Sequence, residues 1–241
     1  MRIRPIMLLT AASSLLMAGS CPTSDPYIGA PVKAPYFSSM ELTGIKSSNE
    51  IRTAVHIQWK LTGRDTCPVR EFVILRKKDA TDSVFTIMHF GIPDSISEDY
   101  DILLEIPEQG VYSKIWYKIF AIDTSGNSGD TSDADSIRIC WPPRFGYPAD
   151  TLQKNEFKWY TIQYMAGYFT YMYLWKADGS LKWTSNKPSE PSYGHESLDS
   201  FSTFLPDSMY PLTKGNYWYG LKVEIPGENI QSLTIQGFYA P

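Results

Sequence analysis

Apolar and polar residues alternate along the chain from about residue 37 onward. Residues 55–61 place Val, Ile, Trp and Leu at every second position, and the same period recurs in residues 72–77, 102–106 and 117–121. Strict alternation over short segments bounded by turn residues is typical of β-strands with one buried face. We find no stretch with a helical period and helix caps there. The pattern therefore predicts an all-β fold.

The alternation continues in the second half of the chain. We expect strands at residues 157–159, 168–176, 217–223 and 231–239. The dipeptide Asp178-Gly179 predicts a tight hairpin after the second of these strands, because glycine tolerates the positive φ of a two-residue turn. Two similar blocks of strands, at 37–141 and 145–241, are joined by the stiff segment Trp141-Pro142-Pro143.

The first block carries a family resemblance. The pattern Val55-x-Ile57-x-Trp59 resembles the second strand of a fibronectin type III domain, whose tryptophan lies in the core. Residues 69–76 resemble the third strand, and residues 116–129 resemble the sixth strand with its following loop. The resemblance implies seven strands in two packed sheets. It also implies that Tyr117 forms a tyrosine corner, with its hydroxyl bonded to backbone at the turn between the fifth and sixth strands.

The second block resembles the same architecture less closely. The pattern Leu212-x-x-Gly215-x-Tyr217 resembles a second tyrosine corner. We therefore expect two tandem antiparallel β-sandwiches of the fibronectin type III or immunoglobulin-like kind, as two diverged copies of one architecture.

The N-terminus is typical of an export signal. Arg2 and Arg4 precede an apolar run, and small residues end the segment 1–20, which is too short for a stable membrane span. Small residues directly before Cys21 resemble the lipobox of bacterial lipoproteins. The resemblance implies that the Cys21 thiol carries diacylglycerol and anchors the protein to a membrane; the alternative is a secreted protein with an incidental cysteine.

The residues after the anchor predict where the protein sits. Pro22 replaces the Asp that retains many lipoproteins at the inner membrane, so we expect the outer membrane of the cell envelope, at its periplasmic face or at the cell surface. Residues 21–36 are rich in proline and predict a semi-rigid tether. Some fifteen such residues span on the order of 45 Å.

Charge and composition exclude several functions. The formal net charge is −4, and removal of Arg2 and Arg4 takes it to −6, so we expect no nucleic-acid partner and no charge-driven attachment to anionic lipid. The three histidines, His56, His89 and His195, are scattered, and His56 should face solvent. No phosphate loop, metal motif or nucleophile motif is present. We therefore predict a non-catalytic protein without a cofactor.

The acidic segment that begins at Asp123 offers a possible calcium site. Asp123, Asp130, Asp133 and Asp135 offer the oxygen ligands that Ca²⁺ prefers. An acidic loop is more often simply solvated, so we expect no metal.

The two remaining cysteines give conflicting predictions. An exported chain with Cys67 and Cys140 invites a disulfide. The predicted topology places these residues at opposite poles of the first sandwich, about 20 Å apart, beyond the reach of a disulfide. We expect them to stay apart, with the bridge as the alternative.

Aromatic residues are concentrated in the second block. From residue 144 onward, 21 of 98 positions are aromatic, against 13 of 143 before it. On the strand 168–176 both faces are apolar, which indicates burial on both sides or an exposed patch with a use. We expect the main function to be that of a spacer or protein-interaction module. In that case most rings fill the core, and the first domain or a neighbouring subunit covers Met172 and Leu174. The alternative is a carbohydrate-binding surface formed by Trp175, Trp183 and Trp218, because flat rings stack on sugar C–H faces.

Overall fold

The computed structural model describes residues 32–62, 68–78, 83–103, 113–140, 142–162, 168–185, 198–225, 227 and 229–241. Every regular element within these ranges is a β-strand, so the predicted all-β fold is confirmed. The predicted signal segment, Cys21, most of the tether and Cys67 lie outside the described residues. No helix in the described part of the chain could cross a lipid bilayer.

The first sandwich has the seven strands expected of it. They are β1 (Tyr36–Ser47), β2 (Glu50–Lys60), β3 (Val69–Lys78), β4 (Thr86–Pro93), β5 (Glu98–Ile102), β6 (Ser113–Asp123) and β7 (Asp135–Ile139). One sheet has the order β1-β2-β5, and β7-β6-β3-β4 belong to the other layer. This is the fibronectin type III-like arrangement that the sequence predicts.

The second sandwich repeats this order strand for strand. Its strands are β8 (Arg144–Tyr147), β9 (Glu156–Ile162), β10 (Phe169–Lys176), β11 (Leu181–Thr184), β12 (Leu198–Phe204), β13 (Gly215–Ile225) and β14 (Ile230–Ala240). The order β12-β9-β8 corresponds to β5-β2-β1, and β11-β10-β13-β14 corresponds to β4-β3-β6-β7. The β10–β11 hairpin turns at Asp178-Gly179 as predicted, with Gly179 at φ 89°.

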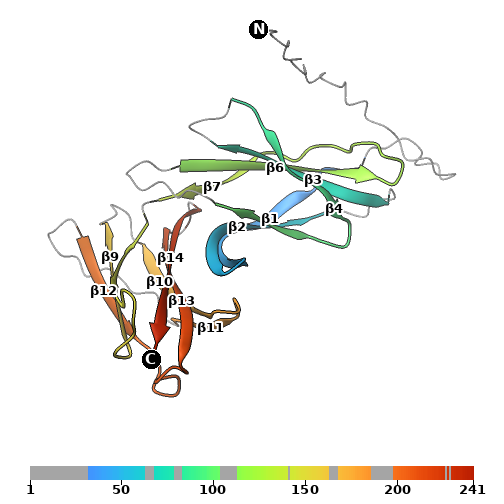
Figure 1. Ribbon diagram of the computed structural model, residues 1–241. Coiled ribbons are helices and arrows are strands. Elements are labelled where there is room, and N and C mark those ends of the chain that lie inside the picture. Colours follow the sequence, from blue (N-terminus) through green and yellow to red (C-terminus); the bar gives the residue numbers. More distant parts are fainter. Residues whose placement is uncertain are drawn as a thin grey trace, which may run out of the picture.

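The two sandwiches share one sheet, which the sequence did not predict. The last strand of each domain pairs with the other in parallel, through Ile230 with Arg138 and Gln231 with Ile139. The result is a continuous sheet of eight strands that spans both domains (Figure 1).

The pairing fixes which face of the shared sheet each domain covers. Paired residues in neighbouring strands point to the same face. Ile139 packs in the first core, whereas its partner Gln231 points away from the second core. The second layers, β1-β2-β5 and β12-β9-β8, therefore lie on opposite faces of the common sheet. The face that forms the core in one domain becomes the outer face in the next.

Each domain has its own core around a tryptophan of its second strand. Trp59 and Trp159 are both at most 2% exposed, and Trp59 packs edge-on against Phe72 at 5.5 Å between ring centres. In the second core, Tyr219 lies 4.5 Å from Phe145 and 5.3 Å from Phe157. Much of the aromatic excess of the second domain thus fills its core.

The end of the predicted tether belongs to the first sandwich. Val32 is only 2% exposed and lies in the first core, and its carbonyl oxygen accepts a bond of 2.9 Å from the Asp130 N–H. A Cβ on Gly129 would lie 2.5 Å from that oxygen, so glycine permits this close approach. The predicted tether boundary at residue 36 is therefore too late: the packed chain already includes Val32.

The two predicted tyrosine corners have different outcomes. The Tyr217 hydroxyl donates to the Thr213 carbonyl at 2.9 Å, which confirms the corner in the second domain. The Tyr117 hydroxyl instead donates to the Asp101 carboxylate at 2.7 Å. Arg76 donates to the other Asp101 oxygen at 2.6 Å. The predicted backbone bond of Tyr117 was therefore wrong, because β5 brings a buried carboxylate within reach of the hydroxyl.

Candidate functional site

The three tryptophans predicted to bind sugar do not form one exposed surface. Trp175 is only 4% exposed. Trp183 pairs with Leu174, which points into the second core, so Trp183 lies on the opposite face of the sheet from Trp175. Trp218 is half-buried and pairs directly with Trp175. The predicted row of rings is therefore wrong, because strand pairing divides these residues between two faces and the junction of the domains buries one of them.

The two faces of β10 have distinct roles. Met172 and Leu174 are fully buried in the second core. The expectation that the first domain or a subunit covers these two residues is thus corrected, since their own domain covers them. The other face carries the rings of Phe169, Tyr171, Tyr173 and Trp175, and we call this side the ring face.

The first domain packs on the ring face through the β1–β2 hairpin. Figure 1 shows this blue hairpin curving away from its own sandwich toward β13 and β14. The Trp175 ring lies between glycines of both domains: a Cβ on Gly44 would be 2.8 Å from the ring, and one on Gly220 would be 2.6 Å from it. Tyr173 stacks on Trp175 at 5.6 Å between ring centres. We call this contact the tryptophan clamp.

One backbone N–H and one side-chain hydroxyl of the hairpin bond to β14 beside the clamp. The Leu42 N–H donates to the Gln231 side-chain carbonyl oxygen at 2.9 Å. The Thr53 hydroxyl donates to the Leu233 carbonyl oxygen at 3.1 Å. Both bonds are buried, and Leu233 itself belongs to the first core. These bonds are well sheltered from water, so breaking the junction would leave polar groups unpaired.

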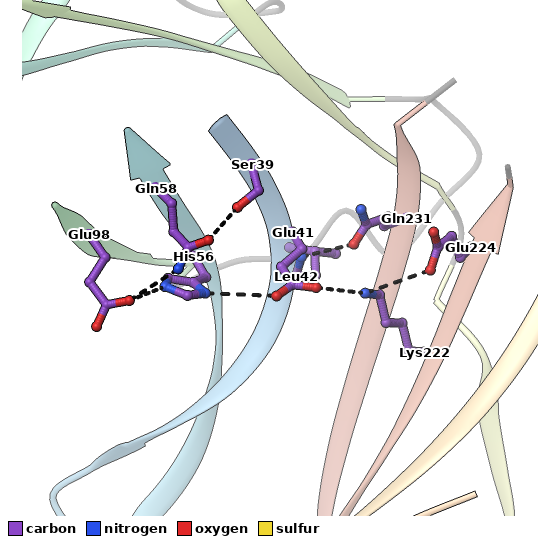
Figure 2. A network of polar contacts seen from close by, with 9 residues as sticks. All are labelled: Ser39, Glu41, Leu42, His56, Gln58, Glu98, Lys222, Glu224 and Gln231. Atoms are coloured by element: carbon purple, nitrogen blue, oxygen red, sulfur yellow. Dashed lines mark hydrogen bonds and ion pairs between the residues drawn. The ribbon is translucent and has the colours of Figure 1, made fainter. Parts of the chain in front are cut away.

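A chain of charged groups crosses the same junction. Lys222 on β13 lies 3.6 Å from Glu41 on β1 and 3.8 Å from Glu224. Glu41 lies 3.8 Å from His56, whose other ring nitrogen is 3.0 Å from Glu98 (Figure 2). Only 5% of the Lys222 side chain is exposed, and these two carboxylates offset the cost of burying its ammonium group.

His56 is more covered than the sequence predicts. Its side chain is 15% exposed, and its ring stacks on Tyr100 with 4.6 Å between centres. Hydrogen bonds from His56 and then Gln58 hold the pKa of the Glu98 carboxyl below its usual value. His56 points away from its own core, as alternation requires, and carboxylates and a neighbouring ring shield it there.

Burial also perturbs a tyrosine of the ring face. Partial burial, reinforced by the charges of Glu41 and Glu224, raises the pKa of Tyr173 to about 12. Each of these causes favours the neutral phenol. Tyr173 thus stays uncharged beside the clamp over the whole physiological pH range.

The acidic segment after β6 is organised by its own hydrogen bonds. Burial would raise the pKa of Asp123, but bonds from Asn127, Ser125 and Gly126 outweigh it and hold the pKa below the usual value. Within the described ranges, no group of three or more His, Cys, Asp or Glu residues could hold a metal ion. Asp123 serves here to shape the turn that follows β6.

Cys140 is buried at the end of β7 and packs against the second core. Its N–H donates to the Gln231 carbonyl oxygen at 2.9 Å. Because Cys67 lies outside the described residues, the expected separation of the two cysteines stays a prediction.

The junction residues were not identified from the sequence. Gly44 and Gly220 are single glycines within strands. Such glycines often mark a close approach of another group, and they are the sequence signal that could have indicated the junction. Gln231 gives no comparable signal, because a polar residue at the start of a strand ordinarily faces water.

Comparisons with known proteins add little beyond the strand order. No protein-family model and no curated protein matches the chain. Among solved structures, the chain is similar to the FN1–FN3 domains of chicken CNTN1, with 14% identity and a TM-score of 0.32 over 87% of this chain and 66% of that one.

Two further solved structures are similar at the same level. Dimeric latent PorU from Porphyromonas gingivalis has 12% identity and a TM-score of 0.31, over 85% of this chain and 20% of that one. The fibronectin(III)-like modules of Clostridium thermocellum CbhA have 10% identity and a TM-score of 0.26, over 85% and 92%. The fold assignment therefore rests on the strand order described above.

Proposed function

We propose that this chain is a non-catalytic lipoprotein of the cell envelope that acts as a spacer or protein-interaction module. In this proposal Cys21 carries the lipid, the segment after it is the tether, and the two sandwiches form one rigid body. The outer membrane is the proposed destination, because Pro22 follows the anchor.

The observation that supports this function best is the junction of the two domains. A shared sheet, two buried hydrogen bonds and the tryptophan clamp fix the second sandwich on the first. A bead-like pair of domains on a hinge would need none of these contacts. A fixed pair of domains holds the surface of the second domain at a constant distance and orientation relative to the first domain, which suits a spacer or scaffold.

The carbohydrate surface predicted on the second domain is not part of this proposal. A stacking surface needs neighbouring rings that water and ligand can reach. Trp175 is buried under the hairpin, and Trp183 lies on the other face of the sheet. The ring face is instead a contact between domains.

Metabolic labelling tests the anchor. Cells expressing the full chain would be grown with an alkyne fatty acid, and the protein would be followed through membrane fractionation. We expect label on the wild type, and loss of both label and membrane association in Cys21→Ser. Label that persists in Cys21→Ser, or a wild type that stays unlabelled and soluble, would contradict the proposal.

Small-angle scattering of the purified chain tests the rigid body. We expect one distance distribution that matches the fixed arrangement at low and high salt. A broad distribution typical of a hinged pair would contradict the spacer function while leaving the anchor untouched.

A further inference from the structure

The outer face of the first domain presents a row in which lysines and rings alternate. Along β6, the outward residues are Lys114, Trp116, Lys118 and Phe120, since Ile115, Tyr117 and Ile119 point into the first core. Successive residues on one face of a strand lie about 6.6 Å apart. The layer β1-β2-β5 covers the opposite face of β6, and the layer β12-β9-β8 covers the half of the shared sheet that belongs to the second domain. We call the four outward residues, together with Lys77 and Phe85 beside them, the lysine–ring row.

The lysines of this row are held over rings rather than by carboxylates. The Nζ atoms of Lys114 and Lys77 lie 4.7 Å and 5.2 Å from the centre of the Trp116 ring. Lys118 Nζ lies 5.2 Å from the centre of the Phe85 ring. Each distance is typical of a cation–π contact. The row therefore holds three ammonium groups against two of its rings, Trp116 and Phe85.

None of these three lysines forms an ion pair with a residue that the structure describes. Other lysines of this net acidic chain do have a carboxylate within 4 Å: Lys154 contacts Glu156, and Lys222 contacts Glu41. Asp133 and Asp135, in the segment beside β6, are exposed and make no ion pair with the row. The row is thus a local surplus of positive charge.

A covering role alone does not account for this surplus. Lysine stems do shield apolar sheet surface while their ammonium groups stay in water. Shielding is satisfied equally well by lysines paired with neighbouring glutamates, as on β9, where Lys158 lies 3.2 Å from Glu156. Three unpaired ammonium groups beside rings have the features needed to bind an anion that also has an apolar face.

We propose that the lysine–ring row binds an acidic polysaccharide, whose carboxylates contact the lysines and whose sugar rings pack on Trp116. Rings stack on the C–H faces of sugars, and hydrogen bonds from ammonium groups to carboxylates are about twice as strong as those between neutral groups. This inference rests on the proposed function, because it names the class of partner that an envelope module would hold.

Affinity electrophoresis of the purified full chain tests the inference. The gels would contain alginate as the acidic probe, neutral dextran as the uncharged probe, or single-stranded poly(dT) as a polyanion without sugar acids. We expect alginate to retard the wild type, with retardation falling as salt rises, and dextran to have no effect. Equal migration in alginate and dextran, or stronger retardation by poly(dT), would overturn the proposal.

Charge-removing variants distinguish binding at the lysine–ring row from general electrostatic attraction. Lys114→Gln with Lys118→Gln should lower affinity for alginate roughly tenfold, because two charge contacts are lost. The matched control, Lys176→Gln with Lys214→Gln, removes the same charge from exposed sites of the second domain. An equal loss in both pairs would mean general attraction and would contradict a site at the row.

Trp116 tests the stacking contribution. Trp116→Ala should weaken binding even at high salt, whereas Trp116→Phe should retain much of it. If Trp116→Ala fails to fold, as judged by thermal melting, the lysine pair decides the question. The anchor test on Cys21 is read in a different assay, so a failure of this proposal is distinguishable from a failure of the proposed function.

Discussion

The two sandwiches have the same strand order but satisfy their sixth-strand tyrosines differently. In the second domain, Tyr217 bonds to the backbone four residues earlier, at Thr213. In the first, Tyr117 bonds to the buried carboxylate of Asp101, which Arg76 also holds. Alternation decides which residues point inward, but the neighbouring strand decides what an inward tyrosine meets. One copy therefore depends on a local turn, and the other on a charged cluster between layers.

The largest expected effect tests the charged cluster of the first domain. Asp101→Ala would leave Arg76 and the Tyr117 hydroxyl without their acceptor, at a cost of about 3–5 kcal/mol in the free energy of unfolding. Chemical denaturation measures it, with the exposed Asp133→Ala as the control. A loss no greater than that of the control would mean that this cluster is not what holds β5 to β6.

The next effect tests the clamp with a matched pair of glycines on the shared sheet. A Cβ on Gly220 would lie 2.6 Å from the Trp175 ring, whereas one on Gly237 would lie 3.4 Å from Trp218. Gly220→Ala should therefore destabilise the protein by about 1–3 kcal/mol, as overpacking does. It should also split a single unfolding transition into two in calorimetry.

Gly237→Ala should leave the single transition intact, because 3.4 Å is ordinary contact. Gly44→Ala, which meets the same ring from the first domain at 2.8 Å, should behave like Gly220→Ala. Similar behaviour of all three variants would show that the clamp does not couple the domains.

A smaller effect tests the tyrosine corner of the second domain. Tyr217→Phe removes one hydrogen bond to a backbone carbonyl, worth about 1 kcal/mol. Tyr117→Phe should cost more, because it removes a bond to a buried carboxylate. The comparison of the two denaturation curves checks the order, and the reverse order would contradict the account of the two domains given above.

The smallest effect is a loss of stability in alkali. Tyr173 has a pKa raised to about 12 in the folded protein, above the ordinary value of 10. The unfolded chain therefore loses its proton first, so this stability is full below pH 10 and is lost as pH rises toward 12. Because Tyr173 is partly exposed, solvent screening should keep the loss at pH 11 below about 1 kcal/mol. Tyr173→Phe should lose less stability than the wild type between pH 9 and 11 in urea denaturation, and an equal loss would contradict the assignment.

The sequence predicts the strands well, for a physical reason. Alternation with a period of two records which side of a strand is buried, and the strands predicted around residues 55–61, 72–77 and 117–121 form where expected. The pattern at 102–106 meets β5 only at Ile102, and residues 104–106 lie outside the described part of the chain. The Asp178-Gly179 turn and the Tyr217 corner are also local, since each needs only residues a few positions apart. Local signals of this kind can be found without knowing the rest of the molecule.

The domain junction could not be predicted in the same way. It depends on two residue pairs between strands that lie about ninety positions apart in the sequence, such as Ile230 with Arg138. A pairing of only two residues leaves no recognisable hydrophobic period in the sequence. The two apolar faces of β10 left burial on both sides and an exposed patch open, because a strand's own sequence does not identify what covers it. The row of three tryptophans failed for this reason: Trp175 meets Gly44 of the first domain, not solvent.

Because the two domains share a sheet, the point where one domain ends in the sequence is not a point where the folded protein can come apart. A protease that cut between Ile139, where β7 ends, and Arg144, where β8 begins, would nick the backbone without freeing either half. The two fragments would remain associated, because Leu233 of one is part of the core of the other. Expressed separately, the halves should instead find each other from solution and reconstitute the intact particle.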